Sequence, residues 1–237
     1  MIFTAGGDVT SKGVQEMFKA LKKINGTIPP WKYFCKIWPS FSSENHGNEE
    51  HALINELELD EENIIYLEGK YSPEFMALLL NACDVYAAPS RLEGFGMIQV
   101  EAMACGKPVI SINVGGPRDT IIHKKTGFLA DVEYEIKLDK EWVYEHMGFK
   151  EKYQIEFPIP KTFAYRANID QLAMYTKLLL NDNALRKKIG EDANQHALKN
   201  FHYLETSKKL IETIKKHNMV YQDMLGDIEK FEQTLNQ

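Results

Sequence analysis

Two carboxylates and two glycines lie close together in the stretch of residues 89–106. Glu93 is expected in a loop, and Glu101 about one turn inside the helix that follows. Gly94 and Gly96 would let the backbone approach a ligand closely, and the free amides at the start of a helix suit an anion. On spacing alone, an ordinary loop followed by an exposed helical glutamate is the favoured interpretation, because short motif matches are common.

A glycine-containing turn at residues 6–13 is a second place where an anion could bind. It lacks the third glycine of a dinucleotide-binding fingerprint, which disfavours a dehydrogenase-like domain. Its order Ser11-Lys12-Gly13 also differs from the Gly-Lys-Ser/Thr order of an NTPase phosphate loop. His46 and His51 flank the start of a helix without a matching cluster of ligands, so no metal or cofactor is expected there.

Strands and helices alternate with short connections from residue 1 to about 131. Apolar residues at helical spacing predict the helices, and Ser72-Pro73-Glu74 opens one of them with an N-cap, a first-turn proline and an early carboxylate. The predicted strands cover residues 2–5, 31–38, 64–67, 84–88, 108–112 and 128–130. The predicted helices of this part cover residues 14–24, about 49–59, 73–82 and 97–105.

This alternation predicts an α/β fold with a doubly wound parallel sheet covered by helices on both faces, a Rossmann-like architecture. Ligands of such sheets collect at the carboxyl ends of the strands. The expected site is therefore formed by the loops after Ala5, Leu67, Ala88 and Ile112.

The second half of the chain breaks this rhythm. Residues 132–166 mix charges, aromatic residues and two prolines, and we expect an irregular insertion with one helix near Glu141. Apolar residues at helical spacing after Asn168 predict three amphipathic helices. The expected organisation is a nucleotide-binding domain over residues 1–215, followed by a helical tail at 216–237.

Composition excludes several kinds of partner. The 28 basic and 34 acidic side chains give a formal net charge of -6, so no general attraction to nucleic acid or anionic lipid is expected. Cys35, Cys83 and Cys105 lie in apolar surroundings and are expected to be reduced packing residues. The most apolar stretch, residues 75–89, is too short to span a bilayer, and Met1 opens no signal peptide, so a cytoplasmic protein is expected.

The stretch around the two glutamates resembles the Glu-x7-Glu signature of glycosyltransferase family 4, whose members are retaining enzymes of the GT-B architecture. The resemblance covers residues 1–131 and, more loosely, 168–215, and it implies the C-terminal, donor-binding domain. Four further segments resemble landmarks of that family in the right order. They are Gly7–Gly13, Ala82–Tyr86, Val114–Gly116 and Thr126–Leu129.

By this resemblance, the substrate is a nucleotide diphosphate sugar. Glu101 would accept hydrogen bonds from ribose hydroxyls, Glu93 would contact the transferred sugar, and Lys12 would neutralise the departing diphosphate. The amides of Gly94, Phe95 and Gly96 would hold sugar and phosphate oxygens. The further donor-binding residues that the resemblance implies are Gly6, Gly7, Tyr71, which would wall the base pocket, and Arg91.

Elementary chemistry agrees with these roles, because breaking a glycosyl-phosphate bond leaves negative charge on the diphosphate, which a lysine and a helix N-terminus stabilise. The chain has no Asp-x-Asp pair of the kind that metal-dependent glycosyltransferases use. The expected activity is that of a metal-independent, retaining hexosyltransferase. Glu93 could act as a nucleophile, but the resemblance favours a same-face attack steered by the leaving phosphate.

The sequence departs from the family pattern at one phosphate ligand. Many members carry an arginine a few residues before the lysine, and here that place is Gly6 or Gly7. Arg91 could compensate, although a solvated or loop-bracing arginine is an equal alternative. Asp119 stands where relatives often have glutamate.

The half that would hold the acceptor is expected to be missing, because a complete protein seldom begins at its ligand loop. Such an isolated donor domain would bind its nucleotide sugar without transferring it. The alternative is a stand-alone nucleotide-sugar-binding or regulatory module that never catalyses. A further domain of about 150 to 200 residues before Met1 would decide between them.

Overall fold

The computed structural model describes residues 1–38, 41–144, 147–148 and 150–216, and the predicted tail beyond them lies outside the described residues. The chain divides into two compact units, Met1–Gln195 and His196–Gln237. The predicted domain boundary at residue 215 stays a prediction. Among the described helices, none is long and apolar enough to cross a membrane.

The first unit is built on a six-stranded parallel sheet with the order β3-β2-β1-β4-β5-β6. This confirms the predicted doubly wound α/β fold. The order reverses between β1 and β4, which pair through Ile2 with Val85 and Phe3 with Tyr86. The strands are β1 (Ile2–Ala5), β2 (Tyr33–Ile37), β3 (Ile64–Glu68), β4 (Val85–Ala87), β5 (Val109–Ile112) and β6 (Gly127–Ala130).

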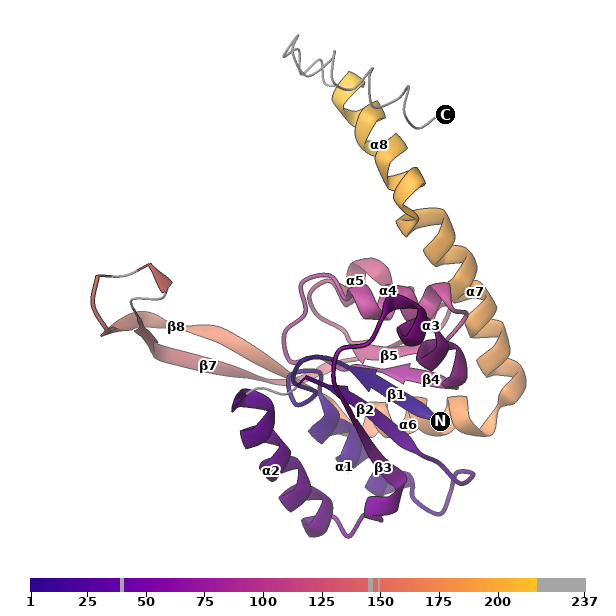
Figure 1. Cartoon of the computed structure of the whole chain (residues 1–237), viewed down its shortest axis with the longest axis horizontal. Helices are drawn as coiled ribbons and strands as arrows, with labels where there is room; N and C mark the ends of the chain where they lie inside the picture. Colours follow the sequence, from indigo (N-terminus) through magenta and orange to yellow (C-terminus); the bar gives the residue numbers. More distant parts are fainter. Residues whose placement is uncertain (39–40, 145–146, 149, 217–237) are drawn as a thin grey trace. The chain divides into compact units, whose positions relative to one another are not determined.

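Helices cover both faces of this sheet, with α1, α2 and α6 on one face and α3, α4 and α5 on the other (Figure 1). The helix at 73–82 begins as predicted, because the Ser72 hydroxyl accepts a hydrogen bond from the Phe75 amide at 3.3 Å. The helices are α1 (Val14–Ile24), α2 (Phe41–Glu56), η1 (Glu61–Asn63, a 3₁₀ turn), α3 (Pro73–Ala82), α4 (Met97–Ala104), α5 (Pro117–Thr120), α6 (Ile169–Asn181), α7 (Asn183–Phe201) and α8 (Tyr203–Lys216).

The core lies between the sheet and its helices, since strands β1, β4, β5 and β6 are buried along their whole length. Strands buried on both faces read as continuous apolar runs, which is why the sequence predicted them. Cys35 and Cys83 are buried and Cys105 is partly buried, and all three are free thiols, as expected for packing residues.

The expectation of an irregular insertion with a helix near Glu141 is wrong. Strands β7 (Val132–Val143) and β8 (Tyr153–Ala167) form a long antiparallel hairpin in place of that insertion (Figure 1). The prolines do not prevent pairing, because Leu138 pairs with Lys161 and Lys140 with Glu156. Residues 157–160, which include both prolines, therefore lie in a bulge opposite one residue of β7 and need not donate ladder hydrogen bonds.

Candidate functional site

Lys12 and Glu93 meet at the point where the strand order reverses. Lys12 lies in the loop after β1, and Glu93 lies in the loop after β4, which is the neighbouring strand. The Lys12 Nζ donates to Glu93 Oε2 at 2.7 Å. Loops at such a switch point diverge and leave a crevice at the carboxyl ends of the strands, where ligands of doubly wound sheets bind.

A cavity of about 340 Å³ opens beside this ion pair. Four of its lining residues were predicted as site residues from the sequence, namely Lys12, Glu93, Phe95 and Gly96. The remaining lining residues are Ala5, Tyr86, Ala88, Met97, Ile98 and Gln99. The cavity therefore lies between the ends of β1 and β4 and the start of α4.

Both oxygens of the Glu93 carboxylate are engaged. Oε2 faces the Lys12 ammonium, and Oε1 accepts a hydrogen bond from the Gly96 amide at 3.1 Å. Gly96 is the N-cap of α4 and has a left-handed backbone, with φ of 88°. No side chain caps α4 and its first turn has no acidic residue, so the Glu93 carboxylate is the negative group that meets its positive dipole end.

A pair of glycines after β5 fixes the loop that carries Glu93. The Gly116 amide donates to the Glu93 carbonyl at 3.1 Å. A Cβ at Gly116 would meet the Gly94 carbonyl oxygen at 2.3 Å, and one at Gly115 would meet the Glu93 carbonyl oxygen at 2.6 Å. Only glycine permits such close backbone packing, so these two residues, identified from the sequence only as a family landmark, shape the site.

The loop that carries Lys12 is fixed in the same way. A Cβ at Gly13 would meet the Pro89 carbonyl oxygen at 2.3 Å, and the backbone there is left-handed, with φ of 83°. A Cβ at Gly6 would meet Lys12 Cγ at 2.8 Å. Close backbone contact thus holds the first loop against the end of β4 and leaves room for the stem of Lys12.

Other predicted residues lie outside the lining of this cavity. Glu101 lies at the surface of α4, where partial desolvation by neighbouring atoms raises the pKa of its carboxyl. The Tyr71 hydroxyl donates to the Glu68 carbonyl at 2.9 Å, and the Tyr71 ring packs on the Phe75 ring with 4.8 Å between the ring centroids. Their ligand roles, like those of Gly7 and Gly94, stay predictions.

Arg91 braces the loops. Its Nη2 donates to Gln15 Oε1 at 2.8 Å and lies 3.4 Å from Glu16 Oε1. Burial lowers the pKa of its guanidinium, although the Glu16 carboxylate opposes this. The loop-bracing alternative accounts for these contacts, and the proposed phosphate contact stays a prediction.

A buried network behind the first loop escaped the sequence analysis. Glu50 of α2 is 2% exposed, and it accepts hydrogen bonds from the Thr10 hydroxyl and, at 2.7 Å, from the Tyr66 hydroxyl. Burial raises the pKa of Glu50 despite these bonds. His46 Nδ1 lies 2.5 Å from Asp8 Oδ2, so this histidine contacts the same loop. Helical spacing alone gave no signal that α2 turns polar side chains toward residues 8–10.

Trp38 was also missed. Its amide donates to the Gly7 carbonyl at 3.1 Å, which places it directly after β2 at the same edge of the sheet. The ammonium groups of Lys70 and Lys36 lie 4.3 Å and 5.3 Å from its ring centroid. A partly exposed tryptophan beside two cations would have been recognisable only once the strand end was known.

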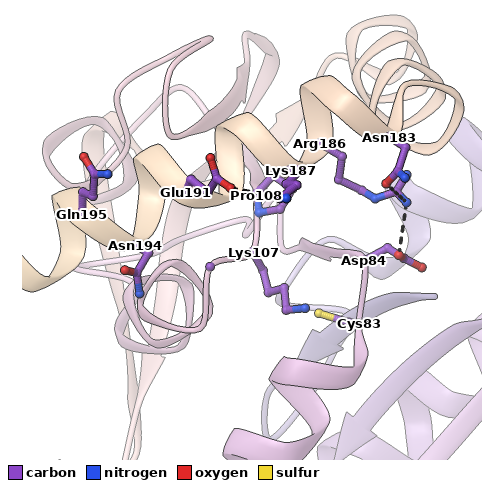
Figure 2. A pocket seen from close by; sticks show the side chains of 11 residues that line it. Cys83, Asp84, Lys107, Pro108, Asn183, Arg186, Lys187, Glu191, Asn194 and Gln195 are labelled. Atoms are coloured by element: carbon purple, nitrogen blue, oxygen red, sulfur yellow. Dashed lines mark hydrogen bonds and ion pairs between the residues drawn. The ribbon is translucent and has the colours of Figure 1, made fainter.

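A second cavity of about 470 Å³ lies at the opposite, amino-terminal edge of the sheet (Figure 2). It is lined by the turns that precede β4 and β5 and by α7. Arg186 Nη2 lies 3.5 Å from Asp84 Oδ1, and Lys107 Nζ donates to the Asn81 carbonyl at 2.8 Å. None of the predicted site residues lines this cavity.

Residues 1–140 match the family model described as glycosyl transferases group 1. The chain belongs to this family. It is 35% identical over 129 residues to an uncharacterized glycosyltransferase of Methanocaldococcus jannaschii, covering 53% of this chain and 32% of that protein. It is 38% identical over 120 residues to a D-inositol 3-phosphate glycosyltransferase of Pseudarthrobacter chlorophenolicus, covering 51% and 28%. This glycosyl transferase group 1 chain thus spans about a third of the length of these curated relatives.

Solved structures share the fold of this glycosyl transferase group 1 chain. Anabaena HepE, crystallised with UDP and glucose, matches with a TM-score of 0.67 at 21% identity, covering 91% of this chain and 48% of HepE. The C-terminal domain of LpcC, a group 1 protein from Francisella tularensis, matches with a TM-score of 0.62 at 19% identity, covering 85% and 86%. The expected place of the chain, as the C-terminal domain of a GT-B enzyme, fits these matches.

Proposed function

We propose that this chain is the donor-binding part of a retaining glycosyltransferase that takes a sugar from a nucleotide diphosphate sugar. The observation that carries the proposal is the Lys12–Glu93 ion pair at the switch point, beside a cavity at the start of α4. A cation, a carboxylate and a helix N-terminus together suit a ligand that joins a diphosphate to a polyhydroxylated ring.

Lys12 would bind the diphosphate while it stays close to Glu93. An ammonium group has three donors, and the pair with Glu93 uses one of them. Two donors are left for phosphate oxygens. As the glycosyl-phosphate bond breaks, Lys12 and the start of α4 would stabilise the charge that develops on the leaving diphosphate, without a metal ion.

Glu93 would bind hydroxyls of the transferred sugar rather than attack it. Lys12 and the Gly96 amide already engage both carboxylate oxygens, and such contacts lower the nucleophilicity of a carboxylate. This supports a same-face attack by the acceptor, steered by the leaving phosphate. Glu101 would accept hydrogen bonds from the ribose, outside the cavity beside Lys12.

Transfer would require residues beyond this chain. Because the chain spans about a third of its curated relatives, the acceptor would be held by a part that their remaining length supplies. Bringing the acceptor against the sugar carbon can lower a barrier by about 7 to 11 kcal/mol. The alternative function, a nucleotide-sugar-binding module without catalysis, would bind the same ligands but gain no activity from an added domain.

A ligand screen tests the proposal. UDP, GDP, ADP and their sugars are added separately while thermal unfolding is followed, since a ligand of the native state raises the unfolding temperature. UDP and UDP-glucose are the first choices, because HepE was crystallised with UDP, with UDP and glucose, and with UDP-glucose.

The control is the matched lysine variant Lys22→Ala. Lys22 lies in α1, the helix that follows the Lys12 loop, and it pairs with Glu58 away from the cavity. We expect at least one nucleotide to stabilise the parent and Lys22→Ala alike, and Lys12→Ala much less. Stabilisation by no nucleotide, or equal stabilisation of Lys12→Ala, contradicts the proposal.

A further inference from the structure

Three charged side chains from separate elements meet beneath the donor site. Arg91 Nη2 and Arg166 Nε lie 3.4 Å and 3.2 Å from the same oxygen, Glu16 Oε1. Glu16 belongs to α1, Arg91 to the loop after β4, and Arg166 to β8 at the base of the hairpin. Their side chains are only 7%, 16% and 19% exposed.

Backbone contacts connect this cluster to both loops of the site. The Arg91 amide donates to the Ser11 carbonyl at 2.9 Å, and Ser11 directly precedes Lys12. The Arg91 carbonyl accepts from the Tyr165 amide at 2.8 Å, so β8 holds the backbone of the same residue from the other side. Arg91 is two residues before Glu93, and it therefore joins the loops that carry the two partners of the ion pair.

The cluster is poorly explained as a device for stability alone. Two partly buried guanidiniums face one carboxylate, and within the described residues the buried atoms Glu16 Oε2, Arg91 Nε and Arg166 Nη1 make no hydrogen bond. Buried ionic groups that are incompletely satisfied cost free energy. An apolar contact between α1 and the hairpin base would pack these elements at a lower cost in free energy. It would not hold the Arg91 side chain in one position.

We propose that Glu16 and Arg166 are positioning residues that hold Arg91 and thereby set the distance between Lys12 and Glu93. The base of the hairpin is then part of the donor site, and the distal arm is not. The role in donor affinity rests on the proposed function, whereas the role in positioning the ion pair does not.

The first test needs no ligand. The coupling free energy between Lys12 and Glu93 is measured by a double-mutant cycle of Lys12→Met and Glu93→Gln in urea unfolding, first in the parent and then with Arg166→Met. We expect Arg166→Met to remove about half of the coupling or more, because misplaced loops separate the charges. Unchanged coupling in a folded Arg166→Met protein overturns the proposal. If that variant does not fold, Arg166→Lys is measured in its place, with a partial loss expected.

Rescue and control variants separate positioning from general damage. The conservative variant Arg166→Lys keeps a cation opposite Glu16 Oε1 and should retain part of the coupling that Arg166→Met removes. Lys137→Met removes the exposed ion pair with Glu135 further along the same hairpin and should leave the coupling unchanged. A loss as large in Lys137→Met as in Arg166→Met would also overturn the proposal.

Calorimetric titration with UDP adds the functional readout. Arg166→Met should weaken UDP binding about tenfold, the effect of losing much of one charged hydrogen bond, and Arg166→Lys should weaken it less. Parental affinity in Arg166→Met contradicts the link to the donor. If UDP fails to bind even the parent, the proposed function fails at UDP, while the double-mutant cycle still decides the positioning role.

Discussion

Lys12 and Glu93 are 81 positions apart in the sequence, yet their charged groups lie 2.7 Å apart. Each residue is unremarkable within its own segment, and the pair exists because parallel pairing of β1 and β4 aligns the loops that follow them. A partly buried pair of this kind is screened less by solvent than a surface pair. The local charge at this site is therefore determined by which loops the fold brings together, and not by the net charge of the chain.

Lys12 and Glu101 are the two residues proposed to contact the diphosphate and the ribose. Lys12→Ala and Glu101→Ala should each weaken nucleotide diphosphate binding by about 1.5 to 3 kcal/mol, the range for hydrogen bonds to charged groups. Both variants should fold, because neither side chain belongs to the core. Calorimetric titration measures the affinity, and an unchanged affinity in either variant would remove the contact assigned to that residue.

Glu50 gives a prediction about pH. Burial raises its pKa in the folded state, so the folded protein binds more protons there than the unfolded chain. Its contribution to stability is present below the unfolded pKa of about 4.3 and is lost as pH rises through the folded pKa. Glu50→Gln should therefore increase the free energy of unfolding relative to the parent at neutral pH, and less so near pH 4.

Urea unfolding at both pH values measures this difference. The hydroxyls of Thr10 and Tyr66 can accept as well as donate, so a glutamine can keep both contacts of Glu50. An equal loss of stability at the two pH values would show that the carboxylate contributes through its hydrogen bonds alone.

The site depends on close backbone packing between the loop after β4 and the loop after β5. Gly116→Ala places a Cβ 2.3 Å from the Gly94 carbonyl oxygen and 2.5 Å from Phe95 Cα, so one loop must move. We expect a destabilisation of about 1 to 3 kcal/mol, measured by urea unfolding, together with weaker nucleotide binding.

Gly47→Ala is the matched control for that variant. Gly47 lies inside α2, and a Cβ there would meet nothing within 4 Å. Alanine should stabilise the helix by about 0.5 to 1 kcal/mol. If Gly116→Ala behaved as Gly47→Ala does, the close packing of the two loops would not be a determinant of the site.

The sequence predicted those elements whose signal is local. The six strands of the sheet read as apolar runs between glycine, proline and helix signals, and Ser72 and Gly106 marked helix ends that the structure confirms. The hairpin was missed although Tyr134, Ile136 and Leu138 alternate with charged residues, because two prolines argued against a strand. Only the pairing register shows that a bulge accommodates them.

The candidate site was predictable to the same degree. Lys12, Glu93, Phe95 and Gly96 line one cavity. The predicted strand ends indicated the loops after Ala5 and Ala88, and the family resemblance implied these residues within them. The contacts of Arg91 with Glu16 and those of Glu50 with Thr10 were not predictable. They join residues on different elements whose relative rotation is decided by packing, which carries no periodic signal in the sequence.

At the scale of the molecule, we predict that the 237 residues bind a nucleotide sugar without transferring the sugar. The donor would be held, but no part of this chain would orient an acceptor against it. Incubation with radiolabelled UDP-glucose and a panel of acceptors, with and without the remaining domain of a full-length protein, measures this. Robust transfer by the chain alone would place the acceptor site within these 237 residues, with the hairpin as the first place to search.

We propose that nucleotide binds at the carboxyl edge of the sheet rather than in the larger cavity at its amino-terminal edge. Amide chemical shifts of the ¹⁵N-labelled chain, followed during titration with UDP, distinguish the two edges directly. We expect saturable changes at residues 6–13 and 93–101, and none at Asp84, Lys107 and Arg186, which line the other cavity. Changes confined to those three residues and their neighbours, with residues 6–13 and 93–101 unmoved, would contradict it.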